Sequence, residues 1–162
     1  MRIAALVLAA AVIGGRAFGE TVPLRKQGGT FVVPVLINDR ITLDFTVDSG
    51  AADVSIPGDV FSTLIRAGTV QQSDMLDEQS YRLADGSEQR SQRFRIRSLR
   101  VGGFELHNVV GSVAPAAGTL LLGQSFLSRT KSWSMDNDRH ALILNETSTR
   151  VASVLRTDFF PG

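Results

Sequence analysis

Apolar and polar residues alternate most regularly between residues 41 and 48. One face of this segment carries Ile41, Leu43, Phe45 and Val47, and the other carries Thr42, Asp44, Thr46 and Asp48. A period of two residues is typical of a β-strand with one buried face. We therefore predict a strand that ends at Asp48, whose side chain points away from the buried face.

Short apolar runs separated by turn residues continue along the chain. The run from Phe31 to Ile37 predicts a strand, and Pro34 within it indicates a sheet edge or a bulge. Short helices are predicted at 59–67, where Gly68 would end the helix, and at 124–129. Further strands are predicted at 51–56, 80–83, 87–97, 106–113, 133–135 and 141–144. Many short strands with little helix and no repeat predict a mostly β domain, a small closed β-barrel with one or two short helices.

The composition fits one folded domain without covalent cross-links. Of the 162 residues, 43% are hydrophobic and none is cysteine, so disulfides and thiolate chemistry are excluded. The formal net charge of +1 gives no general attraction to nucleic acid or to an anionic membrane. The basic and apolar residues that alternate from Arg93 to Arg97 favour a half-buried strand over a nucleic-acid surface, because no aromatic stacking platform accompanies them.

The N-terminus has the pattern of a secretory signal. Met1 and Arg2 precede an apolar stretch from Ile3 to Ile13, and Ala17-Phe18-Gly19 has the small-x-small form of a cleavage site. An uncleaved anchor is the alternative, but the apolar stretch is shorter than the roughly 20 residues that span a bilayer. We expect cleavage before Glu20, no stable membrane insertion afterwards, and a secreted or periplasmic location.

No metal or cofactor site is predicted. His107 and His140 have no acid or second histidine at the spacing of metal ligands, and no phosphate-binding loop is present. Asp136-Asn137-Asp138 resembles the start of a calcium loop, but Arg139 follows and the required downstream glycine and glutamate are absent. We interpret this segment as a hairpin turn.

Asp48, at the end of the strand predicted at 41–48, is followed by Ser49 and Gly50. Leu43 to Ala51, followed by Val54 to Pro57, resembles the active-site segment of the retropepsin-like aspartic peptidases, whose motif is Asp-Thr/Ser-Gly-Ala. The hairpin predicted around Asp85-Gly86 lies where the family has a mobile flap, and Leu121-Leu122-Gly123 matches its hydrophobic-hydrophobic-Gly element. The segments around 124–127, 133 and 142–144 resemble the bacterial secreted branch, so the resemblance extends from about Gly29 to Leu144.

The resemblance implies a retropepsin-type barrel and a role for each matching residue. Asp48 would be catalytic, and Ser49, Gly50 and Ala51 would support the catalytic turn. The residues implied for the flap and for substrate binding are Leu83, Ala84, Asp85, Gly86 and Asp53. Leu121, Leu122 and Gly123 would pack behind the turn as structural supports.

A single aspartate cannot complete this chemistry. Hydrolysis through an activated water needs one carboxylate that takes a proton and a second, protonated carboxyl that polarises the scissile carbonyl. The sequence holds no second Asp-Ser/Thr-Gly motif. We therefore expect a homodimer in which Asp48 of each copy contributes to one site for a peptide or protein substrate.

Two departures from the retroviral pattern keep other interpretations open. Ala52 stands where an acid is usual and Gln124 where an arginine is usual, so an acid–arginine support at the dimer interface is missing. The alternative to an aspartic endopeptidase is a noncatalytic peptide-binding or interaction module that uses the same dimeric cleft. In a third interpretation, Asp48-Ser49-Gly50 is merely a turn of a β-domain.

These inferences divide the chain into four parts. Residues 1–19 form the signal segment and 20–29 a polar lead-in. The aspartic protease domain is expected at 30–145. Residues 146–162 form a C-terminal tail, a candidate part of the dimer interface.

Overall fold

The computed structural model describes residues 19–82 and 85–146. The strands in this part are β1 (Glu20–Pro23), β2 (Arg25–Gln27), β3 (Thr30–Ile37), β4 (Ile41–Val47), β5 (Val54–Pro57), β6 (Met75–Arg82), β7 (Glu88–Val101), β8 (Phe104–Ala114), β9 (Leu121–Leu122), β10 (Ser132–Asp136) and β11 (Ala141–Asn145). The helices are α1 (Gly58–Arg66) and α2 (Gln124–Leu127), with a 3-10 turn at Gln72–Asp74. The predicted mostly β class is confirmed.

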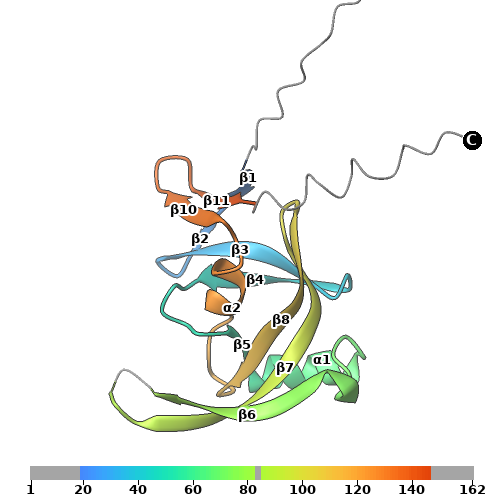
Figure 1. The fold of residues 1–162 in the computed structure, drawn as a ribbon. Coiled ribbons are helices and arrows are strands. Elements are labelled where there is room, and N and C mark those ends of the chain that lie inside the picture. The colour runs from blue at the N-terminus through green and yellow to red at the C-terminus, as the bar shows by residue number, and fades with distance from the viewer. Residues whose placement is uncertain (1–18, 83–84, 147–162) are drawn as a thin grey trace, which may run out of the picture.

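The strand pairings form a closed ring. The larger sheet has the order β2-β3-β4-β9-β5-β8-β7-β6, and β3 also pairs with β7. The pairings from β3 through β4, β9, β5, β8 and β7 therefore return to β3, as expected of a small barrel. A second sheet of β1, β11 and β10 lies at one end of the molecule, and the hairpin of β6 and β7 projects at the other (Figure 1).

The hairpin of β3 and β4 forms as its pattern predicts. Asn38 and Asp39 adopt φ angles of 49° and 54°, which their short polar side chains tolerate better than most residues. Pro34 lies where β3 changes partner on one side: β2 pairs with β3 as far as Val32, and β7 pairs with it from Val35 onward. Pro34 thus occupies a local edge, where a missing N–H does not interrupt a ladder.

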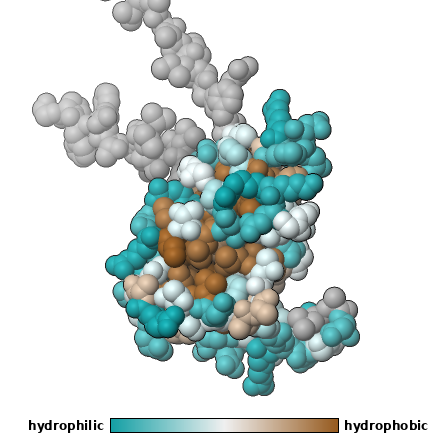
Figure 2. All heavy atoms as spheres, turned by 180° about the vertical axis from the view of Figure 1, so that it is seen from behind, coloured by the Kyte–Doolittle hydropathy of each residue, from teal (hydrophilic) through white to brown (hydrophobic). Residues whose placement is uncertain are grey.

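The barrel is filled by side chains from every strand of the ring. Phe45, Phe94, Ile96, Val109 and Leu122 are fully buried. The rings of Phe61 on α1 and Phe94 on β7 lie 4.8 Å apart, so α1 contributes to this core. Figure 2 shows a further gathering of apolar side chains in the middle of one face, surrounded by polar ones.

Several predicted boundaries differ from the structure. The lead-in 20–29 contains β1 and β2, which pair with β11 and β3. A strand also covers 75–82, although its side chains are mostly polar and exposed. The strand predicted from residue 51 begins at Val54, and the helix predicted at 124–129 ends at Leu127. β1 pairs with the distant strand β11, whereas β2 and β6 pair with the next strand along the chain but are mostly exposed, so local periodicity does not report these strands.

Some predictions fall outside the described residues. These are the signal segment up to residue 18, Leu83 and Ala84 of the predicted flap, and the tail from residue 147. Among the residues that the structure describes, no helix has the length and apolar character needed to cross a membrane.

Candidate active site

Asp48-Ser49-Gly50 forms a turn directly after β4. The Asp48 carboxylate oxygen Oδ1 accepts a hydrogen bond of 2.8 Å from the Gly50 N–H, an arrangement that aspartate side chains favour in turns. The backbone N–H of Ala51 donates to the Asp48 carbonyl at 3.3 Å and closes the turn. The Asp48 side chain is half-buried, whereas Ser49 and Gly50 are exposed.

The turn lies against the Leu121-Leu122-Gly123 element, as the resemblance implies. Strand β9 pairs with the end of β4 in parallel, with Leu122 opposite Val47. The Asp48 N–H donates to the Leu122 carbonyl at 3.2 Å. If Asp48-Ser49-Gly50 were merely a turn, Asp48 could lie far from Leu121-Leu122-Gly123. The structure instead places the two in contact.

The start of α2 holds the loop that follows Asp48. The side-chain amide Nε2 of Gln124 donates to the Ser49 carbonyl at 2.8 Å, and the Gln124 backbone N–H donates to the Ala51 carbonyl at 2.8 Å. A third bond of 2.9 Å runs from the Ser125 N–H to the Ala52 carbonyl. Gln124 was expected only as a departure from an arginine, yet its neutral amide binds the Asp48-Ser49-Gly50 turn directly.

Gly123 permits this close approach. A Cβ atom at this position would lie 2.7 Å from the Ala51 carbonyl oxygen and would overlap the Asp53 carbonyl oxygen. Since real Cβ atoms do not come so near to backbone oxygens, only glycine fits without movement of the loop.

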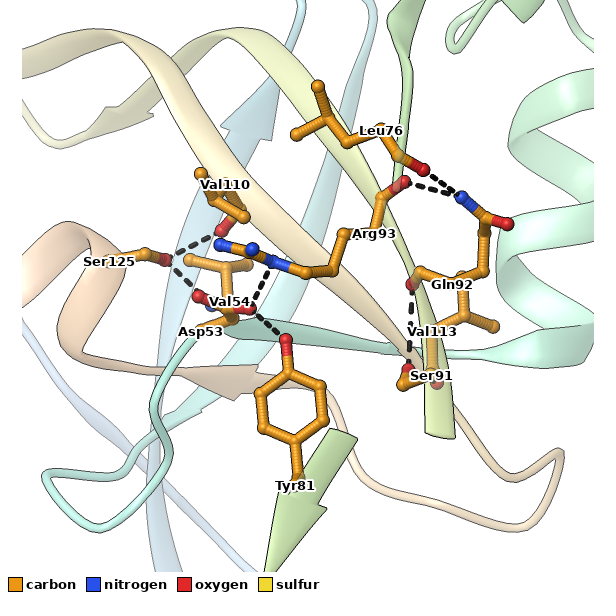
Figure 3. A network of polar contacts seen from close by, with 10 residues as sticks. All are labelled: Asp53, Val54, Leu76, Tyr81, Ser91, Gln92, Arg93, Val110, Val113 and Ser125. Carbon is orange, nitrogen blue, oxygen red and sulfur yellow. Dashed lines mark hydrogen bonds and ion pairs between the residues drawn. The ribbon is translucent and has the colours of Figure 1, made fainter. Parts of the chain in front are cut away.

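Ser125 joins the loop to β8. Its hydroxyl donates to the Val110 carbonyl at 2.6 Å and accepts from the Val54 N–H at 2.9 Å (Figure 3). No sequence motif marks this serine, because a lone serine near the start of a short helix has no distinctive pattern. Together, α2 and β8 fix both ends of the segment from Ser49 to Val54.

A cavity of about 460 Å³ opens beside the catalytic turn. Its walls come from the loop after Asp48, from the flap strands β6 and β7, and from the end of β8. The lining residues are Gly50, Ala51, Ala52, Asp53, Ser55, Ser80, Tyr81, Arg82, Gln89, Ser91, Ser112, Val113, Ala114, Pro115 and Leu121. This arrangement leaves an open space between the Asp48 turn and the β6–β7 hairpin.

The hairpin predicted as the flap is present in its described part. Strands β6 and β7 pair antiparallel, with Arg82 opposite Glu88, and Gly86 has a φ of 84°. The Ser87 hydroxyl and N–H both donate to the Asp85 carboxylate, at 2.6 Å and 2.9 Å. These hydrogen bonds, the hydroxyl's first, hold the pKa of Asp85 below its usual value.

Asp53 lies inside the cavity wall and is bound by two side chains of its own chain. It is only 8% exposed. Its Oδ2 atom accepts a hydrogen bond from the Tyr81 hydroxyl and lies 3.2 Å from Nε of Arg93, so that Figure 3 shows Asp53 between these two groups. Burial, followed by the hydrogen bond to Asp53, raises the pKa of Tyr81 to about 12.

Sequence reasoning named Asp53 but missed Tyr81 and Arg93. Tyr81 is 28 residues from Asp53 and Arg93 is 40 residues from it, and the three come together because β5 pairs with β8, β8 with β7 and β7 with β6. The alternation from Arg93 to Arg97 identified a strand with an arginine face. It did not indicate that this face carries ion pairs to Asp53 and Asp74.

The residues considered for metal binding do not form a metal-binding cluster in the part of the chain that the structure describes. In the described ranges, no group of three or more histidines, cysteines or acids lies close enough to hold a metal ion. Asp136 accepts hydrogen bonds from the N–H groups of Asp138 and Arg139, which fits the predicted hairpin turn.

Comparisons with known proteins agree with this geometry. Residues 33–129 match the model of the family described as "gag-polyprotein putative aspartyl protease". The crystal structure of a retropepsin-like aspartic protease from Rickettsia conorii superposes with a TM-score of 0.58 and 25% sequence identity, over 79% of this chain and 90% of that one. A search of curated protein sequences finds no match. Because the family model matches more than half of the chain and the fold agrees, the chain belongs to the retropepsin-like aspartic protease family.

Proposed function

We propose that the protein is an aspartic endopeptidase that is active as a homodimer. The observation that carries the proposal is the position of Asp48, at the end of β4 in a turn bonded to Leu122 and Gln124, beside a cavity of about 460 Å³. A half-buried carboxyl on a rigid support, next to space for a substrate side chain, is what general acid–base hydrolysis requires.

The second carboxyl would come from Asp48 of another copy. Two carboxyls held close together do not both ionise readily, so they share one proton. The ionised carboxylate would then take a proton from water while the protonated one polarises the peptide carbonyl. The exposed apolar area in Figure 2 is compatible with a partner, since such areas often mark interaction sites.

The missing acid–arginine pair does not leave the catalytic loop unsupported. Neutral hydrogen bonds from Gln124 and Ser125 hold Ser49, Ala51 and Ala52 in place. The departures at Ala52 and Gln124 therefore give no reason to prefer the noncatalytic interpretation.

We further propose that the protein acts outside the cytoplasm, in a secreted or periplasmic form. The support is the predicted signal segment together with the start of β1 at Glu20, the residue that cleavage would leave first. The Glu20 side chain accepts a 2.8 Å hydrogen bond from the Gly103 N–H, so the fold uses this residue. N-terminal sequencing of exported protein tests this: a start well before Glu20 would contradict it.

The central proposal is tested with Asp48→Asn and Asp44→Asn, two identical changes near one strand. Asp48→Asn is expected to abolish cleavage of a diverse peptide library while the circular dichroism and the mass in solution stay unchanged. Asp44→Asn, whose carboxylate pairs with Arg25 at the surface, is expected to retain activity. Full activity of Asp48→Asn would refute the proposal, and peptide binding without cleavage by the wild type would favour the noncatalytic module.

A further inference from the structure

Asp53 is the acid that the cavity beside the catalytic turn presents. Among the described lining residues, it carries the one carboxylate, and Arg82 carries the one positive charge. The Arg82 side chain is 77% exposed and lies 4.0 Å from Glu88, so solvent screens it strongly. The charge that a substrate side chain meets inside the cavity therefore depends on how far neighbouring groups offset the negative charge of Asp53.

Two side chains of the same chain offset the negative charge of Asp53. Arg93 places its Nε atom 3.2 Å from Oδ2 of Asp53, and the Tyr81 hydroxyl donates to the same oxygen. Only 9% of the Asp53 side chain and 28% of the Arg93 side chain are exposed, so water screens this pair far less than a surface pair. The cation and the hydroxyl donor thus occupy the carboxylate that would otherwise attract a basic substrate group.

Apart from Asp53 and the exposed Arg82, the described lining residues are uncharged. Serine hydroxyls contribute hydrogen-bonding groups, and small apolar residues complete the walls near the catalytic turn. The uncharged lining residues include Ala51, Ala52, Ser55, Ser80, Ser112 and Ala114. A substrate ammonium or carboxylate placed here would lose its hydration without gaining a free opposite charge, which is unfavourable.

We propose that Arg93 and Tyr81 determine specificity by neutralising Asp53, so that this cavity selects an uncharged substrate side chain. The inference rests on the proposed peptidase function and goes beyond it, because it assigns a chemical class to one substrate position. Arg93 acts through Asp53 and does not line the cavity, so it is a positioning residue. Tyr81 itself lines the cavity, so a side chain placed there would contact it.

The test compares peptides that carry methionine, glutamine, lysine or glutamate at each position around a cleavage site. At one position, the wild type is expected to prefer methionine and glutamine over both charged residues by kcat/KM. Arg93→Gln leaves the carboxylate uncompensated and should raise the lysine-to-methionine ratio roughly tenfold. Asp53→Asn leaves the guanidinium uncompensated and should raise the glutamate-to-methionine ratio by a similar factor. A general folding defect cannot produce these opposite shifts.

Arg95→Gln is the matched control. Arg95 lies two residues along the same strand, interacts with Asp74 at 3.8 Å, and is absent from the cavity lining. This variant should keep the wild-type ratios. A wild-type preference for lysine that disappears in Asp53→Asn would overturn the inference, since it would mean that Asp53 is free to bind substrate. Unchanged ratios in both Arg93→Gln and Asp53→Asn would overturn it as well.

Binding measurements separate this inference from the proposed catalysis. The same peptides can be titrated onto Asp48→Asn protein, with and without the Arg93→Gln and Asp53→Asn changes. The expected affinity ratios shift in the same directions as the kcat/KM ratios. Wild-type protein that binds peptides with this selectivity but does not cleave them would refute the endopeptidase and support the specificity assignment. Failure to bind any peptide would overturn the specificity assignment.

Discussion

At the scale of single residues, Gln124 shows how a neutral side chain can support a catalytic turn. Its Nε2 atom donates to the Ser49 carbonyl at 2.8 Å, next to the aspartate that would do the chemistry. Glutamate has nearly the same shape but no hydrogen to donate at this position, so its carboxylate would face a carbonyl oxygen. The role of Gln124 can therefore be tested with very little change in volume.

Gln124→Glu is expected to lower kcat roughly tenfold, because a displaced turn misplaces Asp48. The free energy of unfolding should fall by about 1–3 kcal/mol, the cost of an unsatisfied acceptor. Steady-state kinetics and denaturant unfolding measure both effects. Gln27→Glu, on exposed β2, is the control and should change neither. Equal kcat values for Gln124→Glu and the wild type would contradict the assignment.

Tyr81 offers a direct spectroscopic test of the bond to Asp53, because it is the single tyrosine of the chain. Its pKa is raised to about 12 by burial and then by Asp53, so the phenol should ionise well above pH 10 in folded protein and near pH 10 in denaturant. The folded state holds the proton more tightly. This contribution to stability is therefore complete below pH 10 and is lost as the pH rises toward 12.

Ultraviolet absorbance at alkaline pH, with circular dichroism to confirm folding, follows this ionisation. Asp53→Asn should bring the midpoint down while leaving it above that of the denatured chain, because burial is the larger cause. A folded-state midpoint near pH 10 in the wild type would show that Tyr81 is neither buried nor bound to Asp53.

At the scale of elements, the junction of β9 and α2 sets the position of the loop that follows Asp48. A Cβ at Gly123 would overlap the Asp53 carbonyl, so Gly123→Ala should lower the free energy of unfolding by about 1–3 kcal/mol and reduce activity together with it. Gly58→Ala is the matched control. Its new Cβ would lie 3.5 Å from the nearest atom, at the start of α1, and it should be close to neutral. Thermal unfolding of the two variants distinguishes a close approach from a general intolerance of alanine.

Elements with a local signal could be predicted from the sequence. The alternation from Ile41 to Asp48 gave β4, and the polar turn before it gave the β3–β4 hairpin. β1 and the first part of β6, before residue 80, could not be predicted, because each has at most one buried side chain and its pairing with β11 or β7 stabilises it. Periodicity reports a buried face, and these strands have almost none.

The candidate site also contains residues that could be predicted from the sequence and residues that could not. Asp48 and the Leu121-Leu122-Gly123 element carry short motifs, and the structure places them in contact. Tyr81, Arg93 and Ser125 carry no motif, since their importance depends on which residue each one faces across strands. A sequence alone reveals a chemical pattern only where its residues are close together in the chain, and this network is assembled from separate segments.

At the scale of the whole molecule, one chain supplies a closed barrel, a flap and a single Asp48. The proposed chemistry needs two such carboxyls, so it is a property of a dimer. A dimer with one Asp48 replaced would hold only one of the two catalytic carboxyls and should be inactive. Activity should therefore depend on how wild-type and variant chains combine.

Mixing wild-type protein with Asp48→Asn protein, under conditions that allow subunit exchange, tests this most directly. If both Asp48 carboxyls are required, equal amounts should leave about one quarter of the activity of the same total amount of wild type, because about one quarter of dimers carry two intact sites. Activity should fall with the square of the wild-type fraction. A linear fall, with about one half of the activity at equal mixing, would mean that each chain acts alone and would contradict the two-carboxyl site.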